Sequence, residues 1–145
     1  MSGRLTTRIP VTEAQAQRAV VELLELHGWQ CLKTEEDRFR GIPGLPDLLC
    51  TAPNGMQLWV EMKRPPSSRN PRGHVRKRQK ELLAEWRRRG VLCCVADGVT
   101  EHLQEIARLG SGECADTERH HVRLTEVAVL SLCDELMSGV AWWPA

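Results

Sequence analysis

The 145-residue sequence predicts one α/β domain in which a mixed β-sheet is flanked by helices. Short runs rich in Val, Leu, Cys and Trp alternate with longer segments whose apolar residues recur every three to four positions. Turn-forming Pro, Gly and Asn lie between these segments. The expected elements, in chain order, are helix 12–27, strand 29–33, strand 46–51, strand 57–62, helix 75–89, strand 91–96, helix 99–108 and a helix-like run over 122–137.

The N-terminal part of the chain predicts a tail, a helix and a first strand. Residues 1–11 contain little apolar sequence, so we expect a flexible tail. Thr12 suits a helix N-cap, Gln15 completes a capping-box pattern, and Gly28 ends the helix. The run WQCLK is strand-like, and the charged, glycine-containing segment TEEDRFRGIPG after it is expected to be a loop.

The next two strands are predicted to form a hairpin with a defined register. In the connection APNGM over 52–56, proline suits the second position of a type I turn and Gly55 suits the left-handed position that closes a three-residue loop. Residues whose numbers sum to 108 then face each other, which places Asp47 opposite Glu61 on one face. A two-residue Asn-Gly turn is the alternative, and it would place Asp47 on the other face.

The rest of the chain predicts a crossover helix, a parallel strand and a C-terminal extension. The stretch 65–74 contains three prolines and is not expected to be regular. The helix 75–89 follows it, and the strand after that helix should run parallel to 57–62. We expect the core domain to cover 12–107 and the extension to cover 108–145, where the helix and the pair Trp142 and Trp143 are the candidate dimer surface.

Positive charge is concentrated in one segment although the formal net charge is only +1. From residue 63 to residue 90 there are eleven Lys or Arg and two Glu, an excess of nine positive charges. Such a segment suits a phosphate backbone, which rewards each neutralised phosphate by releasing counterions. A solvated helix face is the alternative. The candidate nucleic-acid-binding residues are Lys63, Arg64, Arg69, Arg72, Arg76, Lys77, Arg78 and Lys80.

Cysteine spacing argues against a disulfide-stabilised protein, and hydropathy argues against a membrane-spanning one. The six cysteines show no paired framework, so we expect reduced, structural thiols. A mixed zinc site is the alternative, and its ligands would be His102, Cys114, His120 and His121. No run approaches the roughly 18 apolar residues of a membrane span, and no secretory signal is visible. A soluble, cytoplasmic protein is expected.

The stretch LWVEMK over 58–63 places two opposite charges on one strand face, because alternate side chains of a strand point the same way. Glu61 and Lys63 could be a solvated pair at a strand end. However, Glu61 and Asp47 would repel each other across the hairpin unless a cation lay between them. Magnesium takes carboxylate ligands and activates bound water, and Lys63 would orient that water and stabilise developing charge.

Two further residues are candidates for the same site. At 100° per residue, Glu13 lies about 20° from Val20, on the helix stripe expected to face the sheet. The alternative is a first-turn acid favoured by the helix dipole. Gln79 lies on the apolar stripe of the helix that follows Lys63. It could support the site or be an ordinary peripheral core residue.

The residues PD at 46–47, followed after thirteen residues by EMK at 61–63, resemble the signature of PD-(D/E)XK nucleases. The wider match resembles the VRR-NUC branch of that superfamily over roughly residues 12–107. It consists of TEAQAQ over 12–17, GIPGLPDLL over 41–49, LWVEMKR over 58–64 and QKELLAEW over 79–86.

This resemblance implies a restriction-endonuclease-like mixed sheet and a magnesium- or manganese-dependent phosphodiesterase acting on DNA. It assigns metal ligation to Asp47, Glu61 and the backbone carbonyl of Met62, with Glu13 in an ancillary role. Lys63 would orient the water, and Gln79 would support the site.

Stand-alone members of this branch, of phage or bacterial origin, resemble dimeric junction-resolving enzymes. We therefore expect a homodimer that cuts branched DNA in the cytoplasm of a bacterial or phage-infected cell. The alternatives are a flap- or end-processing nuclease, a restriction-type nuclease, and a catalytically silent nucleic-acid-binding protein with the same fold.

Overall fold

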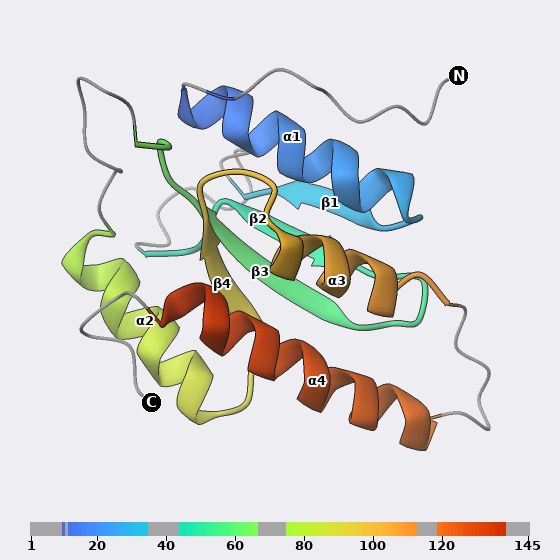
Figure 1. The fold of residues 1–145 in the computed structure, drawn as a ribbon. Helices are drawn as coiled ribbons and strands as arrows, with labels where there is room; N and C mark the ends of the chain where they lie inside the picture. Colours follow the sequence, from blue (N-terminus) through green and yellow to red (C-terminus); the bar gives the residue numbers. More distant parts are fainter. Residues whose placement is uncertain (1–9, 11, 35–43, 67–74, 113–118, 139–145) are drawn as a thin grey trace.

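The computed structural model describes residues 10, 12–34, 44–66, 75–112 and 119–138, and it contains every helix and strand predicted from the sequence (Figure 1). The predicted α/β class is therefore confirmed. The elements are α1 (Glu13–Leu26), β1 (Gln30–Lys33), β2 (Leu48–Thr51), β3 (Gln57–Met62), α2 (Lys77–Arg88), β4 (Cys93–Ala96), α3 (Glu101–Leu109) and α4 (Arg119–Met137).

The beginning of α1 follows directly from its sequence. The Gln15 N–H donates to Thr12 Oγ1 at 3.1 Å, and the Thr12 N–H donates to Gln15 Oε1 at 3.2 Å. This is the predicted capping box, which satisfies two backbone groups that the first turn would otherwise leave without partners.

The four strands form one mixed sheet in the order β1-β2-β3-β4. The first three strands pair antiparallel, and β4 pairs parallel to β3. The register Leu48↔Val60 is the predicted one. In the connecting turn the Ala52 N–H donates to the Met56 carbonyl at 2.8 Å, and Gly55 adopts a φ of 93°, so the loop has the predicted three residues.

The larger part of the core lies between α1, α3 and one sheet face (Figure 1). That face carries Leu58, Val60 and Met62 of β3, all essentially without solvent exposure. The helices contribute buried side chains such as Val20 and Leu103. Because alternate residues of a strand point to opposite faces, this arrangement leaves Trp59 and Glu61 on the other face.

The second face is covered by α2 on the β4 side. Leu83 of α2 packs on Cys93 and Val95, and Trp59 and Trp86 lie against each other with ring centroids 4.9 Å apart. This smaller cluster anchors the basic helix to the strand that carries Glu61.

Helix α4 packs along β4, the last strand of the sheet, and belongs to the same core. It contributes Val129 and Cys133 to the larger cluster and Met137 to the smaller one. Asp134 accepts two hydrogen bonds from Arg87 of α2, at 2.6 and 2.7 Å. The predicted dimer role of 108–145 stays a prediction, and Trp142 and Trp143 lie outside the described residues, as does most of the expected tail.

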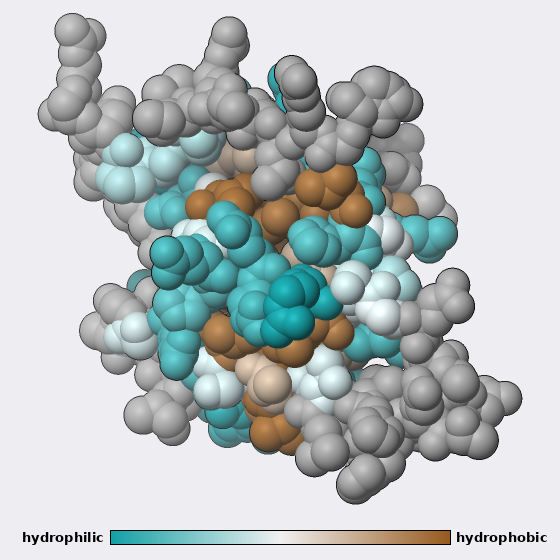
Figure 2. All heavy atoms as spheres, turned by 45° about the vertical axis from the view of Figure 1, so that its right-hand side comes forward, coloured by the Kyte–Doolittle hydropathy of each residue, from teal (hydrophilic) through white to brown (hydrophobic). Residues whose placement is uncertain are grey.

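On the face shown in Figure 2, hydrophilic side chains of the described residues alternate with separate hydrophobic areas. Among the large apolar side chains that the structure describes, Leu26 and Val127 are the strongly exposed ones, at 45% and 67%. None of the described helices combines the length and apolar character that crossing a membrane requires.

Candidate functional site

Two carboxyl groups, the half-buried Asp47 and the buried Glu61, lie where β2 begins and β3 ends. Glu61 is only 1% exposed, so the interpretation of Glu61 and Lys63 as an ordinary solvated pair is wrong. Asp47 directly precedes β2, and its Oδ2 accepts a hydrogen bond from the Met62 N–H at 2.7 Å. The Asp47 carboxyl group lies close enough to raise the pKa of Glu61 through a hydrogen bond and through its negative charge. The hairpin register therefore brings together the two acids predicted from the sequence.

The environment of Glu61 strongly favours its neutral form. Burial raises the pKa of Glu61 to about 9, the hydrogen bond and negative charge of Asp47 act in the same direction, and Lys63 opposes them. At neutral pH and without a cation, Glu61 thus holds a proton next to Asp47. Its Oε2 atom is buried and has no hydrogen-bond partner. A buried acceptor of this kind is costly to leave unsatisfied, and a cation would satisfy it.

Lys63 is held beside the acid pair by α2. Its Nζ lies 3.7 Å from Glu61 Oε2 and donates a hydrogen bond to Gln79 Oε1 at 3.2 Å. The same Gln79 oxygen accepts from the Arg76 N–H at 3.1 Å, at the beginning of α2. Gln79 therefore both caps the helix and fixes the direction of the Lys63 ammonium, as its position on the predicted helix stripe suggested.

Glu13 is placed differently from the other candidates. It is exposed, so the expectation that it lies on the buried stripe is wrong, because burial along that stripe begins only at Ala16. Its negative charge still raises the pKa of Glu61, so it acts on the site through its charge. The direct roles of Glu13 and of the Met62 carbonyl in binding a metal stay predictions.

The acid pair suits a hard divalent cation. Within the described ranges no group of three or more His, Cys, Asp or Glu side chains is arranged to hold a metal ion. Magnesium, however, typically takes one or two carboxylates and completes its shell with water and substrate phosphate. Two adjoining carboxyl groups and a buried oxygen without a partner fit that requirement.

The alternative zinc site is only partly visible. His102 Nε2 lies 2.7 Å from Glu135 Oε2 and joins α3 to α4. The side chains of the other three proposed ligands, Cys114, His120 and His121, lie outside the described residues.

Thr34 positions Asp47, and Gly44 lies against the beginning of α2. The Thr34 N–H donates to the Asp47 carbonyl at 2.9 Å, and its hydroxyl donates to the Pro46 carbonyl. Gly44 has a φ of 81°, and a Cβ there would lie 3.0 Å from the Arg78 carbonyl oxygen of α2. The GIPG sequence carries a signal for Gly44, since such glycines permit close backbone contact. Nothing in the sequence around Thr34 indicates its role.

We expect Gly44→Ala to lower both stability and site function. A non-glycine residue in the left-handed region costs roughly 1–2 kcal/mol, and the added Cβ would push the first turn of α2, with Gln79, away from Lys63. Gly55→Ala is the matched control, because Gly55 also has a positive φ but nothing lies within 4 Å of its added Cβ. Chemical denaturation should show a lower free energy of unfolding in both variants. Only Gly44→Ala should also lose the activity of the site, and equal activity in the two variants would contradict this role of Gly44.

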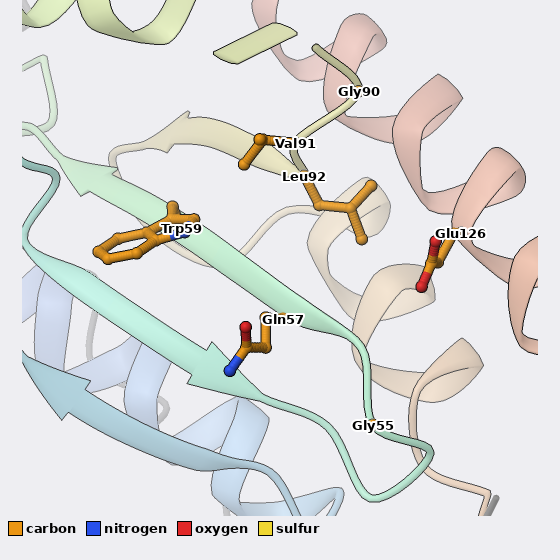
Figure 3. A pocket seen from close by; sticks show the side chains of 7 residues that line it. All are labelled: Gly55, Gln57, Trp59, Gly90, Val91, Leu92 and Glu126. Atoms are coloured by element: carbon orange, nitrogen blue, oxygen red, sulfur yellow. The ribbon is translucent and has the colours of Figure 1, made fainter.

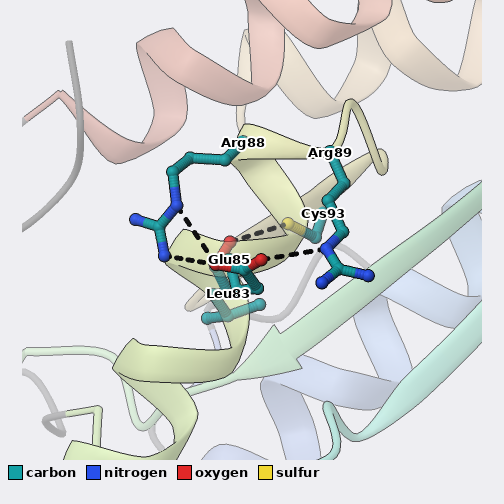
Figure 4. A network of polar contacts seen from close by, with 5 residues as sticks. All are labelled: Leu83, Glu85, Arg88, Arg89 and Cys93. Atoms are coloured by element: carbon teal, nitrogen blue, oxygen red, sulfur yellow. Dashed lines mark hydrogen bonds and ion pairs between the residues drawn. The ribbon is translucent and has the colours of Figure 1, made fainter.

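Among the described residues, acidic side chains pair with the arginines at the end of α2, whereas the first turn of α2 contains no acidic residue. Glu85 accepts hydrogen bonds from Arg88 and Arg89, as Figure 4 shows. At the beginning, Arg76, Lys77 and Arg78 are exposed and the first turn has no acidic residue. Cations there add to the positive end of the helix dipole, so this surface favours an anion such as phosphate.

The other Lys and Arg residues predicted to bind nucleic acid lie partly within and partly outside the described residues. Lys63, Arg64 and Lys80 are half-buried. Arg69 and Arg72 lie outside the described residues.

A separate pocket of about 360 Å³ lies toward the other end of β3 (Figure 3). It contains none of the residues predicted for the site. Its lining residues come from the hairpin, the α2–β4 connection and α4, and they are Gly55, Gln57, Trp59, Gly90, Val91, Leu92 and Glu126.

Comparison with known proteins finds no matching family model, no matching curated protein and no matching solved structure. The resemblance to the VRR-NUC branch stays a prediction, and any function must be inferred from the residues and geometry described above.

Proposed function

We propose that the protein is a metal-dependent DNA endonuclease that hydrolyses phosphodiester bonds. The observation that carries this proposal is the buried Glu61, next to Asp47 and 3.7 Å from the Lys63 ammonium. A hydrophobic sheet face does not need two acids and a lysine for stability, since burying charged groups costs free energy. Such a grouping beside an exposed basic helix start suits hydrolysis of a phosphate ester.

Each residue has a distinct role in this proposal. Asp47 and Glu61 would hold Mg²⁺ or Mn²⁺, which when bound supplies a Lewis acid and lowers the pKa of bound water. The Met62 N–H fixes the orientation of Asp47. Lys63, directed by Gln79, would orient the attacking water and stabilise negative charge that develops on the phosphate oxygens. The beginning of α2 would hold the DNA backbone through Arg76, Lys77 and Arg78.

We further propose that branched DNA is the preferred substrate and that the active form is a homodimer. A four-way junction presents symmetry-related strands, which a twofold dimer could cut together. The exposed Val127 on α4 is a described residue that could contribute to such an interface. A monomer would instead favour flap or end processing.

The function is tested by incubating labelled duplex, single-stranded, flap and four-way-junction DNA with the protein and Mg²⁺, Mn²⁺ or EDTA. We expect metal-dependent cutting with preference for the junction, and no cutting by Asp47→Asn, which should still bind DNA. Binding without cutting on every substrate would instead support a catalytically silent nucleic-acid-binding protein. Sedimentation of the protein alone would decide between dimer and monomer.

Replacing Lys77 and Arg78 together by Gln should weaken binding to all DNA substrates to a similar degree. Phosphate contacts carry no base specificity, and each lost contact lowers the slope of log K against log salt by roughly 0.9 on duplex DNA. The matched control is Arg88→Gln with Arg89→Gln, whose guanidinium groups bind Glu85. Fluorescence anisotropy over a salt series checks this, and equal losses for the two double variants would contradict a phosphate-binding role for the beginning of α2.

A further inference from the structure

Two cysteines face each other across β1 and β2. Cys31 and Cys50 are directly paired in the antiparallel register, and Cys31 packs against the same core cluster that contains Cys50. Directly opposed residues of antiparallel strands have Cα atoms roughly 4.5–5.5 Å apart, which falls within the roughly 4.4–6.8 Å typical of disulfides. No large backbone movement is needed to join the two sulfur atoms.

The two thiols differ in access and acidity. Cys31 is half-buried, whereas Cys50 is 0% exposed. The hydrogen bond from the Cys50 thiol lowers the pKa of Cys31, and the same bond together with burial raises the pKa of Cys50. Cys31 is therefore the thiol that an oxidant can reach and that forms a thiolate more readily, while Cys50 is placed to react with it afterwards.

A second thiol pair provides an internal comparison. Cys94 of β4 and Cys133 of α4 belong to one core cluster, and a hydrogen bond from Cys133 to Cys94 contributes to the raised pKa of Cys133, but both residues are 0% exposed. Burial also raises the pKa of the neighbouring Cys93 to about 12. Both places hold two neighbouring cysteines, and the partial exposure of Cys31 distinguishes the Cys31 and Cys50 pair.

We propose that Cys31 and Cys50 form a reversible oxidation site in which a disulfide joins β1 to β2. With a peroxide as oxidant, the Cys31 thiolate attacks the O–O bond, forms a sulfenic acid, and releases hydroxide, which takes up a proton to become water. The Cys50 sulfur then attacks the Cys31 sulfur, and the sulfenic oxygen leaves as a second water with the Cys50 proton. Two thiols are oxidised and one hydrogen peroxide is reduced.

The disulfide would leave the acid pair intact and stabilise the fold. Cys50 points to the sheet face opposite Asp47 and Glu61, because its partner Leu58 belongs to the face covered by α1 and α3. The bond closes the chain between the two strands and so restricts the unfolded state. This site is independent of the proposed nuclease function and holds whether or not the protein cuts DNA.

The test is peptide mapping of the full chain after graded treatment with hydrogen peroxide under native conditions. Trypsin, which cuts after Lys and Arg, places Cys31 in peptide 19–33 and Cys50 in peptide 41–63, each as the single cysteine. We expect a linked 19–33/41–63 pair to accumulate, to disappear with dithiothreitol, and to be accompanied by a higher melting temperature. The peptides carrying Cys94 and Cys133 should stay reduced.

Two variants make the order of events testable. In Cys50→Ala, Cys31 should stop at the sulfenic acid, which dimedone traps; in Cys31→Ser, Cys50 should stay reduced. A linkage of Cys31 to Cys114, or oxidation of Cys94 and Cys133 before the linked pair forms, would overturn the proposal. Persistence of both reduced peptides at peroxide levels that oxidise Cys114 would overturn it as well.

Discussion

In the absence of metal, Glu61→Gln should be more stable than the wild type at neutral and alkaline pH. When metal is added, the variant should not cut DNA. The folded protein raises the pKa of Glu61 from 4.5 to about 9. Because the pKa of Glu61 is higher in the folded protein than in the unfolded chain, the stabilising contribution of Glu61 is fully present below the unfolded pKa of 4.5. That contribution is lost as the pH rises toward 9. The wild type should therefore lose up to about 1.4 kcal/mol per pH unit over this window relative to the variant.

Urea unfolding in EDTA at pH 5.5, 7 and 8.5 measures this effect. Gln keeps the size of the side chain but cannot ionise, so its free energy of unfolding should change less with pH. Glu85→Gln is the control, because Arg88 and Arg89 lower the pKa of this exposed acid and no alkaline gain is expected. Added Mg²⁺ should stabilise the wild type at pH 8.5 and leave Glu61→Gln unchanged. Parallel pH profiles for the wild type and Glu61→Gln would show that Glu61 is not a destabilising buried acid.

Lys63→Met should lower the rate of DNA cutting roughly 10²–10³-fold, the typical effect of removing one group that stabilises transition-state charge. The methionine keeps the apolar stem but removes the cation that lies 3.7 Å from Glu61 and donates to Gln79. Removing this charge should also raise the pKa of Glu61 further, because Lys63 lowers it. Single-turnover cutting with saturating protein separates the chemical step from binding.

Lys77→Met is the matched control for this substitution. It removes a cation of the same kind from the exposed beginning of α2, where binding and not chemistry should suffer. We expect Lys63→Met to keep DNA affinity within a few-fold and to lose rate, and Lys77→Met to show the reverse. Loss of affinity and rate in equal proportion in Lys63→Met would indicate that Lys63 only binds phosphate.

The acid pair could be predicted from the sequence because local turn chemistry fixes it. The APNG turn sets the hairpin register, and the register alone determines that Asp47 faces Glu61. Gln79 could be predicted only as a candidate, since helical periodicity places it on the apolar stripe of α2 but does not distinguish a site residue from a peripheral core residue. For the acid pair, a short-range rule determined a long-range contact.

Other features depend on contacts that no local pattern encodes. Gly44 meets the Arg78 backbone only because two distant segments pack together. The pairing of Cys31 with Cys50 depends on how β1 aligns with β2, and the long connection between them carries no turn signal for that register. The sequence of α4 predicts a helix but does not indicate that it packs along β4 and reaches both parts of the core.

The most direct test of the central claim is cutting of a labelled four-way junction by the wild type and by Asp47→Asn, each with Mg²⁺ and with EDTA, alongside binding. We predict that only the wild type with Mg²⁺ forms product, while both proteins bind the junction. Cutting that persists in EDTA or in Asp47→Asn would contradict the assignment of Asp47 and Glu61 as a metal-dependent nuclease site.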